Sequence, residues 1–184
     1  DASFLYMETP ETPMHVAGLS IVELPPGFSG SFYEVYKRHI GSRLHLFPIL
    51  KKKIVPVPWD IDHPIWLDDD ALDLDYHIRN LGLPKPGTRQ QLEELVGRLH
   101  SNFLDRSRPL WEFYVIDGLA DGHLAIYTKI HHAAVDGGAG MALTNMMYDV
   151  SPSGRQVEPP PPTSTHKIPD AIELIGGAYR NMLS

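Results

Sequence analysis

The stretch KIHHAAVDGGAG, residues 129–140, holds the side chains of this sequence that are best suited to chemistry. Two adjacent histidines, His131 and His132, precede Asp136 and a run of glycines. An imidazole titrates near neutral pH, so it can take a proton from a hydroxyl group and later return it. A nearby carboxylate can fix the tautomer of such a histidine. The stretch therefore indicates an acid–base centre, a metal site, or two structural histidines before a turn.

A strand expected over residues 123–131 gives the two histidines different roles. Successive side chains on a strand point to opposite faces. If the pairing persists to residue 132, His132 shares the more apolar face with Ile130, and His131 shares the other face with Lys129. We therefore expect His132 to face an interior cavity and act as the base, while His131 orients the loop.

The residues around the histidines narrow the chemistry. Asp136 could bond to a histidine directly, or it could brace the loop through an arginine elsewhere. Glycines at 137, 138 and 140 allow a tight turn and leave space for a long ligand, so we place Gly137, Gly138 and Gly140 in the substrate-binding region. Adjacent histidines diverge on a strand and no third ligand is visible nearby, so we expect no metal. The absence of a Gly-x-Ser-x-Gly motif argues against a covalent serine mechanism.

The elements that must position this stretch can be read from hydrophobic spacing and breakers. Thr88, with Gln91 three residues on, is expected to cap the clearest helix. Two apolar runs separated by DGLADG are expected to form a close antiparallel pair. The expected strands cover residues 14–24, 51–59, 74–80, 110–116 and 123–131, and the expected helices cover residues 31–47, 88–105 and 137–150.

Composition sets further bounds. The 184 residues carry a net charge of −7, which argues against a nucleic-acid partner. The absence of cysteine excludes disulfides and thiol catalysis, and no apolar run is long enough to span a bilayer. We expect a cytoplasmic protein, with peripheral contact to a membrane or a lipid inclusion as an open alternative. We divide the chain into a domain over residues 1–150, a proline-rich linker over 151–167 and a helix over 168–184 that leads to a second domain.

The sequence resembles one family in three places. The string His131-His132-Ala133-Ala134-Val135-Asp136-Gly137 matches the HHxxxDG signature of the CoA-dependent, chloramphenicol acetyltransferase-like acyltransferases. The opening DASFLYMETPETPMHVAGLSI and the segment RPLWEFYVIDGL (108–119) resemble the bacterial wax ester synthase/diacylglycerol acyltransferase family. The three segments occur in the family's order and extend over residues 1–140.

This resemblance implies an α/β fold, a two-layer sandwich with a mixed, largely antiparallel sheet and helices. The chain would be the N-terminal half of a pseudo-duplicated two-domain enzyme, with the active site in a tunnel between the halves. The C-terminal half of the same enzyme would therefore be a partner. The family's second-half motifs are absent from the sequence given, so this chain alone should be insufficient for activity.

The resemblance also implies a reaction. A fatty acyl group would pass from acyl-CoA, a substrate and not a cofactor, to a long-chain alcohol or diacylglycerol. His132 would be the general base, with direct attack and no acyl-enzyme. Asp136 would brace the loop through an arginine, and Pro109, Leu110 and Trp111 would shape the core and tunnel wall. Other hypotheses are a condensation domain that uses carrier-bound acyl donors, a non-catalytic lipid-binding module and, less favoured, a metal hydrolase.

Overall fold

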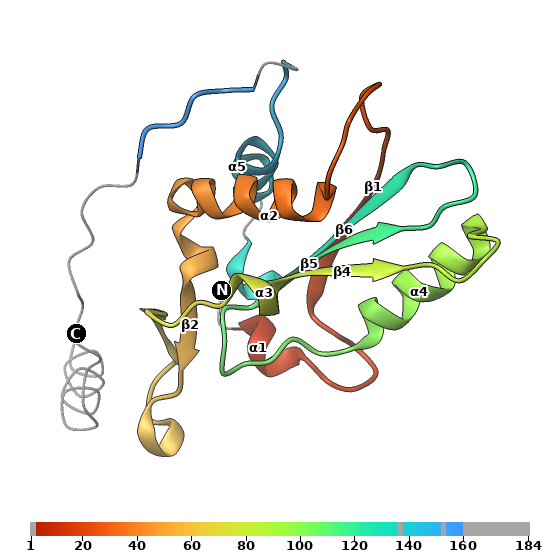
Figure 1. The fold of residues 1–184 in the computed structure, drawn as a ribbon. Helices are drawn as coiled ribbons and strands as arrows, with labels where there is room; N and C mark the ends of the chain where they lie inside the picture. The colour runs from red at the N-terminus through yellow and green to blue at the C-terminus, as the bar shows by residue number, and fades with distance from the viewer. Residues whose placement is uncertain (1–2, 136–137, 152–153, 160–184) are drawn as a thin grey trace.

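A four-stranded mixed sheet forms the centre of the molecule (Figure 1). The computed structural model describes residues 3–135, 138–151 and 154–159. The strands lie in the order β1-β6-β5-β4, and their bounds are His15–Val22 for β1, Ile78–Gly82 for β4, Trp111–Asp117 for β5 and Leu124–His131 for β6. Only β4 and β5 are parallel; the other pairs are antiparallel. The expected mixed, largely antiparallel sheet is confirmed.

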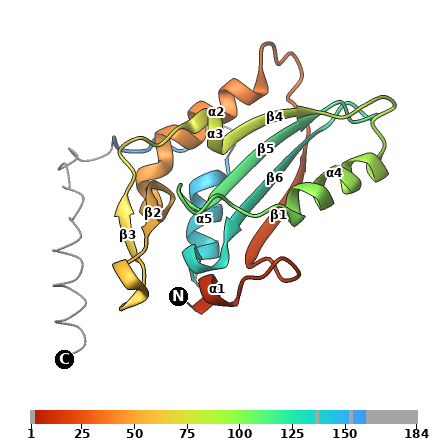
Figure 2. The ribbon, with the colours of Figure 1, turned by 90° about the horizontal axis from the view of Figure 1, so that it is seen from below.

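Helices cover both faces of this sheet (Figure 2). Helices α2 (Phe32–Arg43) and α5 (Ala139–Met147) lie over one face, and α4 (Arg89–Ser101) lies over the other. Because alternate side chains of β5 and β6 pack against opposite layers, both strands are almost completely buried. Alternation along β6 therefore separates two buried faces and does not separate core from solvent.

Helix α4 begins as its sequence predicts. Thr88 accepts a hydrogen bond from the backbone N–H of Gln91, and the Gln91 side chain accepts one from the Thr88 N–H. This capping box satisfies two N–H groups that a helix start leaves without intrahelical partners. The other end of α4 is held by the buried Lys129 of β6, whose Nζ donates to the carbonyls of Leu99 (2.8 Å) and Asn102 (2.9 Å).

A two-stranded hairpin projects away from the sheet (Figure 1). It consists of β2 (Lys52–Val55) and β3 (Ile65–Asp68). Lys53 Nζ lies 3.0 Å from Asp69 Oδ1, and Lys52 Nζ lies 3.4 Å from Asp68 Oδ1, so two ion pairs join the two strands of the hairpin. The expected strand over 51–59 ends earlier because Pro56 and Pro58 cannot donate to a strand ladder.

Two sequence predictions need correction. Residues 74–80 were expected to form one strand, but Leu74–His77 form a short helix, α3, and only then does β4 begin. The side chain of Asp73 accepts from the N–H of Asp75, a local bond that favours a helix start over a strand. The helix expected over 88–105 ends at Ser101, which leaves Phe103 outside it and 45% exposed.

The expected helix over 168–184 and most of the linker lie outside the described residues, and the domain boundary at 150 stays a prediction.

Candidate functional site

His131 ends β6 and is buried beside the strand β1. Its backbone pairs with His15, and its own N–H donates to the carbonyl of Leu110 (3.0 Å). Its Nδ1 accepts from the N–H of Ala133 (3.0 Å), while its Nε2 lies 3.4 Å from Glu8 Oε1. Burial is the main cause that lowers the pKa of His131, to about 4, so the ring is neutral near pH 7.

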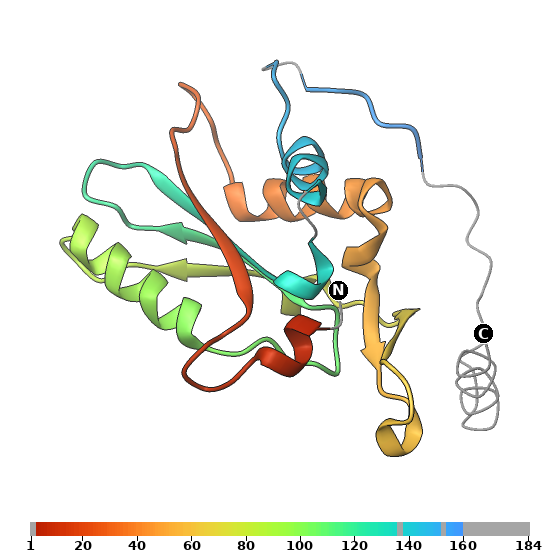
Figure 3. The same ribbon diagram turned by 180° about the vertical axis from the view of Figure 1, so that it is seen from behind.

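His132 begins a 3₁₀ turn over His132–Ala134 and is only partly buried. Its N–H donates to the carbonyl of Met14 (2.8 Å), and its ring stacks on Phe4 with centroids 4.0 Å apart and planes at 19°. Its Nδ1 is buried and has no hydrogen-bond partner among the described residues. The strand stops at His131, so the alternation of side chains along β6 does not determine the direction of the His132 ring. The turn separates the two rings instead: Phe4 stacks on His132, and Glu8 faces His131. The short helix before β1 lies beside this turn (Figure 3).

The remaining residues of the motif divide between described and undescribed positions. Asp136 and Gly137 lie outside the described residues, so the choice between a direct Asp–His bond and a loop brace stays a prediction. Gly138 is the N-cap of α5, and Gly140 lies in its first turn; both are exposed. A side-chain carbon built at Gly140 would meet no atom within 4 Å, which is consistent with the open space expected there.

Pro109, Leu110 and Trp111 are buried, and Leu110 and Trp111 pack in different clusters; their role in a tunnel wall stays a prediction. Leu110 packs with Leu5, Leu104 and Ala133, next to the histidine turn. The indole N–H of Trp111 donates to the carbonyl of Leu50 (2.8 Å), and its ring stacks on His77 at 4.4 Å. Trp111 thus belongs to the main core, whereas Leu110 lies beneath the candidate site.

Sequence reasoning missed three residues of this site, Phe4, Glu8 and Arg106. Phe4 and Glu8 come from the segment before β1, and Arg106 from the loop between α4 and β5. Arg106 Nη2 donates to the carbonyl of Leu5 (2.7 Å) and to Glu8 Oε2 (2.9 Å). Phe4 and Glu8 lie in the opening segment that resembles the family, which was a signal for them, whereas Arg106 lies outside the quoted segments and shows no periodic signal.

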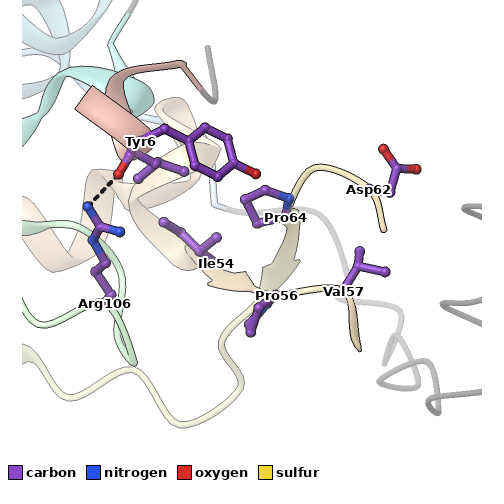
Figure 4. Close-up of a pocket in the computed structure, with 8 residues that line it drawn as sticks. Tyr6, Ile54, Pro56, Val57, Asp62, Pro64 and Arg106 are labelled. Atoms are coloured by element: carbon purple, nitrogen blue, oxygen red, sulfur yellow. Dashed lines mark hydrogen bonds between the residues drawn. The ribbon is translucent and has the colours of Figure 1, made fainter. Parts of the chain in front are cut away.

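A pocket of about 210 Å³ lies beside α1 (Ser3–Met7), on the side of the hairpin (Figure 4). Its walls are mostly apolar; Tyr6 extends towards Pro64, and Arg106 lies at one end. Leu5 lines this pocket and also packs on Ala133 of the histidine turn. Leu5 therefore connects the packing beneath the histidine turn to the wall of the pocket.

Neither a metal-binding cluster nor a membrane-spanning helix occurs in the part of the chain that the structure describes. No group of three or more histidine, aspartate or glutamate side chains there could hold a metal ion. No helix there is long and apolar enough to cross a membrane.

Condensation domains and wax ester synthase/diacylglycerol acyltransferases share this arrangement of sheet and helices. The fold matches the starter condensation domain of the rhizomide synthetase RzmA with a TM-score of 0.59 and 12% identity, over 79% of this chain and 35% of that one. At that identity the likeness shows the fold alone. A stronger match is the wax ester synthase/diacylglycerol acyltransferase from Marinobacter aquaeolei VT8, with a TM-score of 0.71 and 32% identity over 85% of this chain and 39% of that chain.

The chain belongs to the wax ester synthase/diacylglycerol acyltransferase family. The model of that family's catalytic domain matches residues 1–183. A relative from Mycobacterium tuberculosis, named as probable diacylglycerol O-acyltransferase tgs2, is 37% identical over 184 residues. That match covers 98% of this chain and 40% of the relative, so the chain spans about two fifths of its length. A second relative from the same species, named as probable diacylglycerol O-acyltransferase tgs3, is 39% identical over 81% of this chain and 54% of its own.

Proposed function

We propose that the protein transfers a fatty acyl group from acyl-CoA to a long-chain alcohol or to diacylglycerol, forming wax ester or triacylglycerol. The observation that carries this proposal is the position of His132: partly exposed, stacked on Phe4 and held by its backbone at the end of a buried strand. Membership of the family and the names of its relatives supply the reaction class.

In the proposed reaction His132 acts as the general base. Its imidazole takes the proton from the acceptor hydroxyl as that oxygen attacks the carbonyl carbon of the thioester. Collapse of the tetrahedral intermediate breaks the C–S bond, and the imidazolium returns the proton to the departing thiolate. No acyl-enzyme is formed. The stacked Phe4 ring restricts the orientation of the base, which keeps it aligned for the proton transfer.

The surroundings are suited to lipid substrates. The Leu5, Leu110 and Ala133 side chains make the floor below the turn apolar, and the pocket beside α1 extends it. The open space at Gly140 leaves room beside α5 for a chain or for CoA. We propose that the C-terminal half of the relatives' length contributes the other wall of the site.

Two other functions remain as outcomes of a test. A condensation domain would require a carrier-bound donor, and a lipid-binding module would cleave no thioester. The decisive experiment incubates the full-length protein with palmitoyl-CoA and either hexadecanol or diacylglycerol, and measures both ester formation and free CoA. Ester formed with wild type, but at least about a thousandfold more slowly with His132→Ala, supports the proposal. Thioester cleavage that survives His132→Ala would refute the assignment of the base.

A further inference from the structure

The carboxylate of Glu8 lies almost buried between three groups that converge on it. Its side chain is 6% exposed. Oε1 accepts from the N–H of Met14 (3.1 Å) and faces Nε2 of His131 at 3.4 Å. Oε2 accepts from Arg106 (2.9 Å). A buried carboxylate needs such partners, because an unpaired buried charge is strongly destabilising.

These contacts determine which nitrogen of His131 carries the proton. Nδ1 accepts from the N–H of Ala133, so it must be unprotonated. The neutral ring therefore has its proton on Nε2, which is the nitrogen that faces the Glu8 oxygen. The Ala133 N–H leaves Nε2 as the protonated nitrogen. Nε2 makes no hydrogen bond among the described residues, and the Glu8 carboxylate, 3.4 Å away, is the negative charge that faces it.

The same contacts hold the backbone on both sides of His132. On its C-terminal side, the N–H of Ala133 is bound by Nδ1 of His131, and Glu8 faces the opposite nitrogen of the same ring. On the other, the N–H of His132 donates to the carbonyl of Met14, whose own N–H is held by Glu8. A single carboxylate from before β1 thus connects to both peptide units that orient the His132 ring.

We propose that Glu8 is a positioning residue for His132: it holds His131 in the Nε2–H tautomer and thereby fixes the turn that aims the His132 imidazole. Its effect on rate rests on the proposed function, whereas its effect on the tautomer does not. Glu8 takes no proton from the substrate in this scheme.

The tautomer is tested first, on the wild-type full-length protein, by long-range ¹H–¹⁵N NMR of histidine side chains. The His131 signals are identified by their loss in His131→Asn. We expect the Nε2–H form in wild type and a mixture of tautomers in Glu8→Met. An Nδ1–H form in wild type, or no change in Glu8→Met, overturns the proposal whether or not the protein is active.

The rate is tested by a double-mutant cycle, which isolates the coupling between two residues. An asparagine at position 131 can accept from the Ala133 N–H through its own Oδ1, so it does not need a tautomer to be selected. We expect Glu8→Met to lower kcat about tenfold in the wild-type background with KM for palmitoyl-CoA unchanged, but less than about threefold in the His131→Asn background. Equal losses in both backgrounds would mean that Glu8 acts by another route.

The matched control is Arg106→Met, which removes the other partner of Glu8 and leaves its contacts with Met14 and His131. We expect that variant to keep the Nε2–H tautomer. If it shifts the tautomer as much as Glu8→Met does, the ion pair and not the carboxylate is the determinant, and the proposal is wrong. A wild type without ester formation would instead refute the proposed function, and the NMR result would stand separately.

Discussion

Trp111 belongs to the segment that resembles the family's Pro-Leu-Trp motif, and its position predicts a role in stability and not in chemistry. Its ring is 1% exposed and faces the core. Replacing it by Phe removes the indole N–H and leaves the buried Leu50 carbonyl without its 2.8 Å partner, which costs about 1–3 kcal/mol. The smaller ring leaves roughly 30–40 Å³ unfilled, which at about 24 cal/mol per Å³ adds about 1 kcal/mol. We therefore expect Trp111→Phe to lower the free energy of unfolding by about 2–4 kcal/mol.

Thermal unfolding of the full-length protein, followed by circular dichroism, measures this loss. In a protein of the relatives' length, a change of that size lowers Tm by about 2–4 °C. The matched control is Trp59→Phe, because Trp59 is 82% exposed and should leave Tm unchanged. At a temperature where both variants are folded, we expect kcat and KM of Trp111→Phe to stay within about threefold of wild type. An unchanged Tm together with lost turnover would refute the reasoning and would place Trp111 against the substrate.

Three further predictions concern the frame of the site. Arg43 and Asp149 form an almost buried pair at 2.6 Å that ties α2 to the end of α5, so Arg43→Met should lower the free energy of unfolding by about 3–5 kcal/mol in urea titrations. The Arg43 guanidinium lowers the pKa of Asp149 below its ordinary 3.8. The stability that the ion pair contributes is therefore fully present above pH 3.8 and is lost as the pH falls through the lowered pKa. His131 has a folded pKa of about 4 against an ordinary 6.5; wild-type stability should therefore fall between pH 6.5 and 4, and His131→Asn should flatten that slope. Asp136→Ala should lower both Tm and kcat; an unchanged Tm with lost kcat would favour a direct bond to a catalytic histidine over the expected loop brace.

Local signals in the sequence were enough to predict the elements whose causes are local. The capping box at Thr88 and Gln91 marked the start of α4, and the paired apolar runs predicted β5 and β6. The sheet's mixed order required the family resemblance, because strand neighbours far apart in the sequence leave no local trace. The α3 turn was missed because a single Asp73 bond outweighed a strand-like composition.

The histidine motif of the candidate site could be predicted from the sequence, but the residues that hold the two histidines in place could not. His131 and His132 were found from spacing, but the parity that separated them assumed a strand that continues past its actual end. Buried charges such as Lys129 and Glu8 were unpredictable, because their cost is met by partners from other segments. From the sequence alone, charged residues such as these are predicted to lie on the surface.

The pairing of β1 with β6 also has a consequence for biosynthesis. Among the strands of the sheet β1 emerges first from the ribosome and β6 last, yet β6 is the only neighbour that β1 has in the described sheet. Until His131 has been made, His15 and the whole first strand have no ladder to join, so the edge is exposed during elongation. Contacts of such long sequence separation are formed slowly, because a large loop must close first. A chaperone that covers β1 until β6 has been made would therefore also protect the neighbouring segment that carries Phe4 and Glu8.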